Sequence, residues 1–497
     1  MFDQYSKLKQ VFYLQIIILC IILVAGLNAQ NNDLSDEEIS RSVEDALDRS
    51  VVVSSHLIDV STTDGIVTLS GTVGNILESG DAVRVAEYIK GVRSVVDNIK
   101  VNPPVREDEA IREDIMNAII NNPATEAIEV RVSVENGIVI LEGNVESVQE
   151  KWLLQRMAKG VRGVRRINNR IIVESQVERS DSEIKADIEG RFAADFLINQ
   201  ENLEIEVRDG VVVLDGETGS AWKRSYLENA AYVTGVTNVI VDQVDVNPDL
   251  RIEEIRLKKE GLTDVEIKRS VMRSLAYDPR VYSFNVEVEV EEGVVTLTGI
   301  VNSLTAKRNA EQDAWNTIGV KDVDNRIKVR LEEMPPDNKI RQSVEKAIAR
   351  DPFLDRFEIT VFVSNGRTFL YGRLDTFYEQ RRLVNIVSDV KGVIDIQNNT
   401  EVTKTWVRKS DRKIKEDIIQ ELKWDVRIGE DDIQVSVEDG VARLEGTVMT
   451  PSERMIAVQK SFEAGAKAVR SYLTLPYLPD IEPDTYENPP VYTGLRY

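Results

Sequence analysis

Seven basic side chains and no acidic one lie between residues 151 and 170 of this 497-residue chain. Guanidinium and ammonium groups attract phosphate and carboxylate groups, and a tryptophan within the same run would suit a membrane interface. Because each basic residue near an anionic bilayer contributes about 1 kcal/mol, the run is a candidate contact for anionic lipid headgroups. The candidate patch consists of Lys151, Trp152, Arg156, Lys159, Arg162, Arg165, Arg166 and Arg170.

An alternative interpretation is that the protein neutralises this patch internally. Acidic faces of neighbouring units, such as Glu107 to Asp114, would compensate it, since runs of surface charge are commonly solvated or paired. The whole chain carries 62 Lys and Arg residues against 85 Asp and Glu residues, a formal charge of −23. Such a charge opposes long-range attraction to nucleic acid, so we expect no nucleic-acid partner.

Catalytic and metal-binding chemistry has few candidate residues. The sequence contains one cysteine, Cys20, and one histidine, His56, whereas thiolate nucleophiles, imidazole bases and clustered nitrogen or sulfur ligands need these side chains. Acidic residues are abundant, but solvated charge is their default role on helix and strand surfaces. The sequence also has no nucleophile elbow, phosphate-binding loop or calcium loop. We therefore expect no enzymatic activity, no cofactor and no metal.

The N-terminal segment predicts export. Lys7 and Lys9 precede an apolar stretch from Val11 to Leu27, and the sequence becomes polar after Ala29. This order is typical of a secretory signal peptide over residues 1–29. An uncleaved membrane anchor is the alternative, because about 17 to 19 apolar residues can just span a bilayer. Removal of residues 1–29 would leave no cysteine, so the exported chain would fold without disulfides.

Glycines at fixed spacings indicate the elements that position the basic run. A pair of glycines six positions apart occurs six times, and a third glycine follows each pair by 19 or 20 residues. Such regularity is the signature of an internal repeat. Glycine adopts the backbone angles of tight turns and helix ends at little cost, so we interpret these positions as structural. They are Gly65, Gly71, Gly91, Gly137, Gly143, Gly163, Gly210, Gly216, Gly235, Gly293, Gly299, Gly319, Gly366, Gly372, Gly392, Gly440, Gly446 and Gly465.

Each repeat predicts the order α-β-β-α-β. The repeats open with apolar residues at i, i+4 and i+8, which predict a helix, and three of these helices begin with capping boxes. Alternating apolar residues then flank a turn such as Asn136-Gly137, which predicts a β-hairpin. A second helix and a last strand follow. Because that helix connects two strands by a crossover, we expect a three-stranded mixed sheet with both helices on one face. The capping boxes are Ser35/Glu38, Ser180/Glu183 and Thr263/Glu266.

The expected fold is therefore α+β, a tandem array of six small units. A unit of about 70 residues is marginally stable alone, so neighbouring units are expected to pack together. A long linker separates the array into three plus three, and a tail rich in proline and tyrosine is expected to be extended and solvated, with docking to a partner as the alternative. The boundaries are 1–29 for the signal peptide, 34–102, 108–175 and 180–247 for units 1 to 3, 248–261 for the linker, 262–331, 337–403 and 410–475 for units 4 to 6, and 476–497 for the tail.

The repeat resembles the BON domain, a family named for bacterial osmotically inducible periplasmic and nodulation proteins. The resemblance rests on hairpins such as Gly-Val-Val-Thr-Leu-Thr-Gly at 293–299 and on a closing Gly-Val-x-x-Val/Ile-x-Asn/Asp-x-Ile-x-Val, and it covers roughly residues 34–475. It implies a non-enzymatic envelope module that binds phospholipid surfaces or acts like a chaperone.

From this resemblance we expect a protein exported to the periplasm that binds or protects the cell envelope in osmotic or envelope stress. Its expected partner is a membrane phospholipid surface. The alternative is a periplasmic structural or chaperone-like array that binds envelope proteins without any lipid contact.

Overall fold

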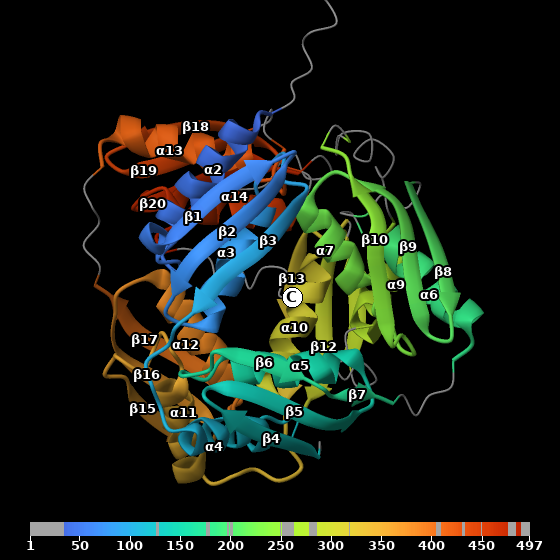
Figure 1. The fold of residues 1–497 in the computed structure, drawn as a ribbon, viewed down its shortest axis with the longest axis vertical. Helices are drawn as coiled ribbons and strands as arrows, with labels where there is room; N and C mark the ends of the chain where they lie inside the picture. Colours follow the sequence, from blue (N-terminus) through green and yellow to red (C-terminus); the bar gives the residue numbers. More distant parts are fainter. Residues whose placement is uncertain are drawn as a thin grey trace, which may run out of the picture.

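The computed structural model describes residues 34–125, 129–174, 179–195, 198, 202–248, 250, 263–277, 286–317, 319–403, 409–429, 433–448, 450–475 and 484–488. The expected signal peptide and most of the expected linker lie outside these residues. Within them, six copies of the predicted α-β-β-α-β unit follow one another (Figure 1), which confirms the α+β fold. No helix in the described part of the chain is long and apolar enough to cross a bilayer.

Each unit contributes two helices. The first helices of units 1 to 6 are α2 (Asp36–Arg49), α4 (Asp108–Ile120), α6 (Asp181–Ala194), α9 (Asp264–Tyr277), α11 (Asp337–Arg350) and α13 (Asp411–Trp424). The second helices are α3 (Ile76–Glu87), α5 (Val148–Lys159), α7 (Ala221–Ala230), α10 (Leu304–Trp315), α12 (Phe377–Ser388) and α14 (Pro451–Glu463).

Each unit also contributes an antiparallel hairpin and a last strand that pairs in parallel with the second hairpin strand. The hairpins are β1 (Ile58–Thr63) with β2 (Ile66–Val73), β4 (Val130–Glu135) with β5 (Ile138–Val145), β8 (Leu203–Arg208) with β9 (Val211–Thr218), β11 (Val286–Glu291) with β12 (Val294–Val301), β15 (Thr360–Ser364) with β16 (Arg367–Leu374), and β18 (Ile433–Glu438) with β19 (Val441–Thr447). The last strands are β3 (Ser94–Val101), β6 (Arg166–Asn169) with β7 (Ile172–Val173), β10 (Asn238–Val246), β13 (Asp322–Asn325) with β14 (Lys328–Val329), β17 (Asp395–Val402), and β20 (Ala468–Thr474).

The hairpin turn is tied to the first helix in every unit. In unit 2, Asn136 and Gly137 adopt φ angles of 52° and 74°, as a two-residue type I′ turn requires. The carboxylate of Asp108, the first residue of α4, accepts hydrogen bonds from both of their backbone N–H groups at 2.8 and 2.9 Å. The same pair of bonds recurs in all six units. One carboxylate therefore fixes the turn against the start of the helix.

Backbone conformation explains why the motif positions are glycines. All eighteen have positive φ angles, which a side chain would strain. Gly163, for example, ends the turn after α5, and a Cβ there would lie 2.9 Å from Cδ1 of Ile111 on α4. The third glycine thus allows the end of the second helix to approach the first helix.

The three N-terminal units form a closed ring (Figure 1). The first residue of each second helix packs into the next unit: Ile76 against the core of unit 2, Val148 within the core of unit 3, and Ala221 within the core of unit 1. The backbone N–H of Ala221 also donates to the carbonyl of Val92 at 3.1 Å. Because unit 3 returns to unit 1, the three units need no further copy to complete their contacts.

The three C-terminal units repeat this arrangement. Leu304 packs into the core of unit 5, and the ring of Phe377 lies 6.3 Å from the ring of Phe462 in unit 6. The Ser452 hydroxyl donates to the side-chain oxygen of Asn316 in unit 4 at 2.9 Å. A second ring therefore closes from unit 4 through units 5 and 6.

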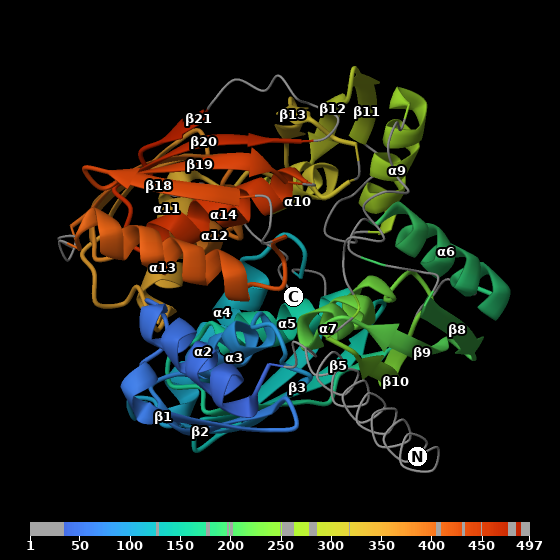
Figure 2. The ribbon, with the colours of Figure 1, turned by 90° about the horizontal axis from the view of Figure 1, so that it is seen from above.

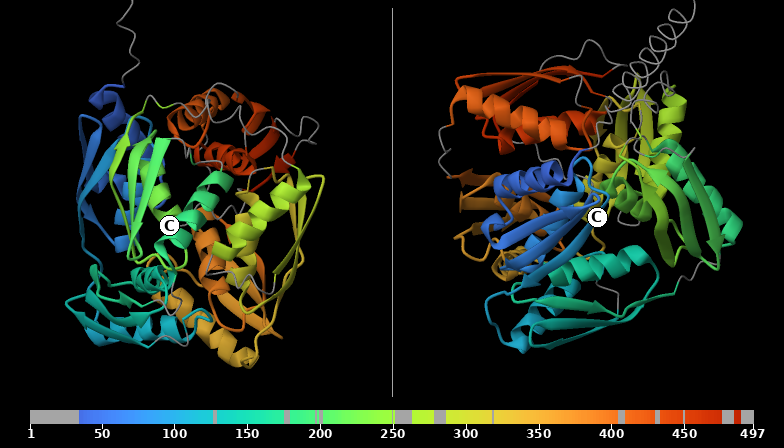
Figure 3. Two further views of the ribbon diagram at one scale, coloured as in Figure 1. Left: turned by 90° about the vertical axis from the view of Figure 1, so that its right-hand side faces the viewer. Right: turned by 45° about the horizontal axis from the view of Figure 1, so that its top comes forward.

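The two rings stack face to face, with sheets outward and helices inward (Figures 2 and 3). Unit 1 lies on unit 6, unit 2 on unit 5 and unit 3 on unit 4. In each pair, the end of a first helix meets the loop after a second helix, as where Lys391 donates its backbone N–H to the carbonyl of Asn121 at 2.7 Å. Equivalent backbone contacts join Lys90 to Trp424 and Asp195 to Thr317.

The described part of the tail adds a strand to unit 6. Strand β21 (Asp484–Tyr486) pairs antiparallel with β20, and Arg454 holds Asp484 at 2.7 Å. Burial raises the pKa of Tyr486 to about 12. This stretch docks onto the chain's own sheet, which differs from a solvated tail; residues 476–483 and 489–497 lie outside the described residues.

Candidate functional site: a cavity shared by six units

The two stacked rings enclose a cavity of about 970 Å³. All six second helices contribute to its wall, together with the C-terminal ends of first helices. The cavity exists only in the assembled protein, because a single unit supplies a small part of the lining.

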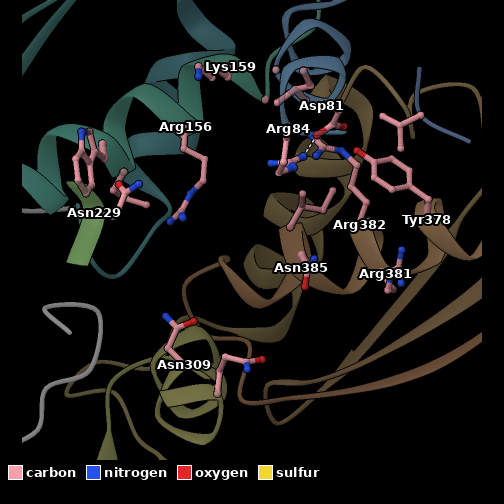
Figure 4. A pocket seen from close by; sticks show the side chains of 18 of the residues that line it. Asp81, Arg84, Arg156, Lys159, Asn229, Asn309, Tyr378, Arg381, Arg382 and Asn385 are labelled. Atoms are coloured by element: carbon pink, nitrogen blue, oxygen red, sulfur yellow. Dashed lines mark ion pairs between the residues drawn. The ribbon is translucent and has the colours of Figure 1, made fainter. Parts of the chain in front are cut away.

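Residues at one equivalent position of the repeat line the cavity in all six units. Each second helix begins after a Ser, Thr or Asn that caps its N-terminus, and the ninth residue after that cap lines the cavity in every unit. Figure 4 shows several of these side chains directed into the open space. The six residues are Arg84, Arg156, Asn229, Gln312, Asn385 and Gln459.

The wall is more basic than the protein as a whole. Among the described residues that line the cavity, eleven are Lys or Arg and nine are Asp or Glu, although acidic residues outnumber basic ones in the whole chain. The wall also carries aromatic residues, including Tyr88, over whose ring the guanidinium of Arg427 lies at 3.6 Å. A wall with this balance of charges favours an anionic occupant over a cationic one.

Several of the cations are matched by buried acids. Arg382 contacts Asp351 at 2.5 Å, and Arg427 contacts Asp425 at 2.5 Å. Burial alone would raise the pKa of Asp425, but the adjacent Arg427 outweighs it and keeps the pKa below its usual value. In each of these pairs the two opposite charges neutralise each other, and the ion pair stabilises the cavity wall.

The surroundings of Lys460 and Lys159 shift the pKa values of these two lysines in opposite directions. Lys460 contacts Glu421 at 2.8 Å, and its acidic neighbours outweigh burial and raise its pKa. Burial and the neighbouring Arg84 guanidinium lower the pKa of Lys159. Within the described part of the chain, Lys159 has no ion-pair partner. Its end of the cavity therefore carries a basic group that the protein itself does not neutralise.

The residues of the predicted basic patch do not share one surface. Arg156 and Lys159 line the cavity (Figure 4). Arg162 lies in the contact between units 2 and 5, where its side chain donates to Asp355 at 2.7 Å. Arg165, Arg166 and Arg170 remain exposed on the outside of unit 2, and Lys151 is half-buried on α5.

Trp152 is not placed as an interfacial residue. Its ring packs edge-on against the ring of Tyr232 in unit 3, with centroids 4.5 Å apart, and it belongs to the apolar contacts of that unit. Within the segment 107–114, which was expected to compensate the patch, Asp114 contacts Arg106 at 2.9 Å and Glu109 contacts Arg112.

The sequence interpretation missed most of the cavity wall. The amide residues Asn229, Gln312, Asn385 and Gln459 have ordinary helix-surface types and no local motif. The signal that would find them is their equivalent position in the repeat, because residues at one position meet only if the units close into rings.

The fold and this cavity define a repeat protein in which six small α+β modules surround one central chamber. The chain belongs to the BON-domain family: the family profile, described as "BON domain", matches residues 35–103, 107–175, 180–248, 263–330, 336–404 and 410–475.

Two curated proteins are similar to parts of this chain. The chain is similar to osmotically-inducible protein Y of Escherichia coli K12, at 29% identity over 152 residues, which cover 29% of this chain and 76% of the relative. An uncharacterised protein of Anaplasma centrale from the gshII 5' region is 29% identical over 114 residues, covering 22% of this chain and 76% of that protein. Among solved structures, CdsD, a structural protein of the type III secretion system of Chlamydia trachomatis, aligns with 44% of this chain and 98% of its own length, at 17% identity and a TM-score of 0.12.

Proposed function

We propose that this chain is an exported, non-enzymatic BON-repeat protein of the cell envelope that acts in osmotic or envelope stress by contacting anionic phospholipid. The similarity to an osmotically inducible protein supports the stress role. The observation that carries the lipid contact is the exposed basic strand of unit 2, defined as Arg165, Arg166 and Arg170. Ile172, which is 57% exposed, follows on the same edge and offers an apolar side chain to a bilayer.

The basic strand of unit 2 carries more positive charge than the equivalent strand of unit 4. Arg166 and Arg170 are exposed, and Arg170 contacts Glu142 at 3.3 Å. The equivalent strand of unit 4 carries Asp322 where unit 2 has Arg166. Three arginines near an anionic surface would contribute about 3 kcal/mol, against the repulsion of a chain with a charge of −23. The contact should therefore be weak and sensitive to salt.

Co-sedimentation with vesicles tests this proposal. The protein is mixed with phosphatidylglycerol or phosphatidylcholine vesicles at low and high salt, and compared with Arg165→Glu/Arg166→Glu/Arg170→Glu. The matched control, Lys321→Glu/Arg326→Glu/Lys328→Glu, makes the same change of charge on the equivalent strand of unit 4.

Binding to phosphatidylglycerol alone, lost at high salt and in the unit 2 variant but kept in the control, would support the lipid contact. Absence of binding under all conditions, or equal loss in both variants, would refute it.

A second observation favours protein binding as the alternative function. On the outer face of unit 5, Phe362 and Tyr371 are 57% and 46% exposed, and the Phe362 ring lies 5.8 Å from Phe369. The equivalents of Phe362 and Phe369 in unit 4 are Glu289 and Thr296.

Such an aromatic face suits apolar segments of other proteins. Suppression of the aggregation of reduced α-lactalbumin by the protein, and its loss in Phe362→Ser/Tyr371→Ser, would support this alternative. No suppression by the unaltered protein would exclude it.

A further inference from the structure

Three basic side chains from units 1 and 2 line the central cavity. Arg84 lies on α3, and Arg156 and Lys159 lie on α5, one turn apart. All three line the cavity, as Figure 4 shows. Arg84 is close enough to Lys159 to lower its pKa, in addition to the effect of burial. Like charges are thus held near one another within a partly dehydrated space, which is unfavourable without an anion.

Acidic groups near these side chains are already engaged. Asp81 forms an ion pair with Arg84 one turn along α3, and Asp351 is held by Arg382 at 2.5 Å. Lys460 and Glu421 pair within unit 6, and Arg49 of unit 1 also contacts Glu421. Lys159 therefore lacks what the other buried lysine of the cavity has, an acidic neighbour among the described residues.

The cavity has room and access for a small molecule. Its volume of about 970 Å³ is at the upper end of the range of small-molecule sites, and the side chain of Arg84 is 45% exposed, so solvent reaches this cation. On the wall formed by unit 4, Asn309 is 8% exposed and its Nδ2 donor has no acceptor among the described residues. Basic groups from units 1 and 2 and a free donor from unit 4 both call for an acceptor-rich occupant.

We propose that the central cavity binds an anion that carries phosphate groups, held by Arg84, Arg156 and Lys159. Guanidinium groups bind phosphate oxygens in pairs, and an ammonium group adds a point charge with free donors. A tetrahedral phosphate presents oxygens in several directions at once, which suits cations that arrive from two helices. The site is separate from the exposed strand of unit 2, so its failure would leave the proposed lipid contact standing.

Isothermal titration with pyrophosphate at low ionic strength tests the site in the purified protein. We expect saturable binding that weakens at least tenfold in Lys159→Gln and in Arg156→Gln. Lys159→Arg should keep most of the affinity, because it keeps the charge. The control Lys100→Gln removes an exposed charge from the outer strand β3 and should leave binding unchanged. Melting curves of each variant establish that it is folded.

Binding to phosphatidylglycerol vesicles distinguishes two sources of the phosphate group, a soluble anion and a lipid headgroup. Pyrophosphate binding that depends on Lys159, with vesicle binding unchanged in Lys159→Gln, would assign the cavity to a soluble anion. Loss of vesicle binding in the same variant would assign it to a lipid headgroup. The proposal would be overturned by either of two results. In the first, the protein does not bind pyrophosphate and Lys159→Gln binds vesicles as well as the unaltered protein does. In the second, Lys159→Gln and Arg156→Gln leave the affinity for pyrophosphate unchanged.

Discussion

Replacement of Leu304 by alanine should destabilise the neighbouring unit rather than only its own. Leu304 begins α10 of unit 4, but its side chain is 8% exposed and belongs to the core of unit 5. Truncation of a buried leucine costs about 2–5 kcal/mol. Since Leu304 lies at the edge of that core, we expect the lower end, about 2 kcal/mol, which corresponds to a roughly 30-fold change in an opening equilibrium.

Amide hydrogen exchange measures this effect unit by unit. Exchange of the buried amides of β16 in unit 5 depends on how often that unit opens, and Leu304→Ala should accelerate it by about the factor of 30 derived above. Val265→Ala removes an exposed side chain from the first helix of unit 4 (66% exposed) and serves as the control. If exchange changes in unit 4 while β16 stays protected, the units are autonomous and the closed-ring interpretation is wrong.

Three further substitutions test the local structure. Gly71→Ala should cost about 2 kcal/mol or more in thermal unfolding, because its Cβ would lie 1.9 Å from the carbonyl oxygen of Leu57, whereas Gly80→Ala meets open space and should not destabilise. Asp337→Asn should cost about 1–3 kcal/mol in urea unfolding, because an amide has one oxygen for the two turn N–H groups that the carboxylate accepts at 2.8 and 3.0 Å. Burial raises the pKa of Glu87, so its charged form weakens the fold, and Glu87→Gln should raise the melting temperature by about 1–3 °C near pH 7. That gain should vanish as pH falls through the raised pKa to the ordinary carboxyl range, and an equal gain at both pH values would contradict it.

The internal structure of each unit could be predicted because short segments determine it. The turn at Asn136 and Gly137 needs two residues with positive φ, and few residue types supply them at low cost. The capping box of Ser180 and Glu183 forms as expected, with the Ser180 N–H donating to the carboxylate at 2.9 Å. Residues such as these act within one turn of chain, so their effect does not depend on distant neighbours.

The closure into two rings could not be predicted from periodicity. Ile76, Val148 and Leu304 are apolar residues at helix starts, and an apolar residue there is compatible with packing in its own unit or in the next. The available signal was that the residue directly after the cap is apolar in all six units, including Phe377 and Pro451. Its meaning depends on which units are neighbours in space, which the repeat pattern does not specify.

The basic patch was misplaced because it crosses two kinds of element. Residues 151–159 lie on a helix whose exposed side faces the cavity, whereas residues 165–170 lie on a strand at the outside. A run of charge that is continuous in sequence therefore divides where the chain passes from the inner layer to the outer one. Composition gives the total charge of such a run but not the direction in which each part faces.

Because the six units are joined in one chain, the residues that line the chamber can differ from unit to unit, which six identical subunits would not allow. At the ninth position after the helix cap, a symmetric hexamer would place six copies of one side chain around the cavity, and six arginines there would repel one another. This chain places arginine in units 1 and 2 and an amide in the other four. At this position, arginine is thereby confined to units 1 and 2, and amides that both donate and accept hydrogen bonds occupy it in the other four units. Covalent linkage fixes which unit takes which place, and so allows a nearly symmetric shell to enclose an asymmetric binding surface.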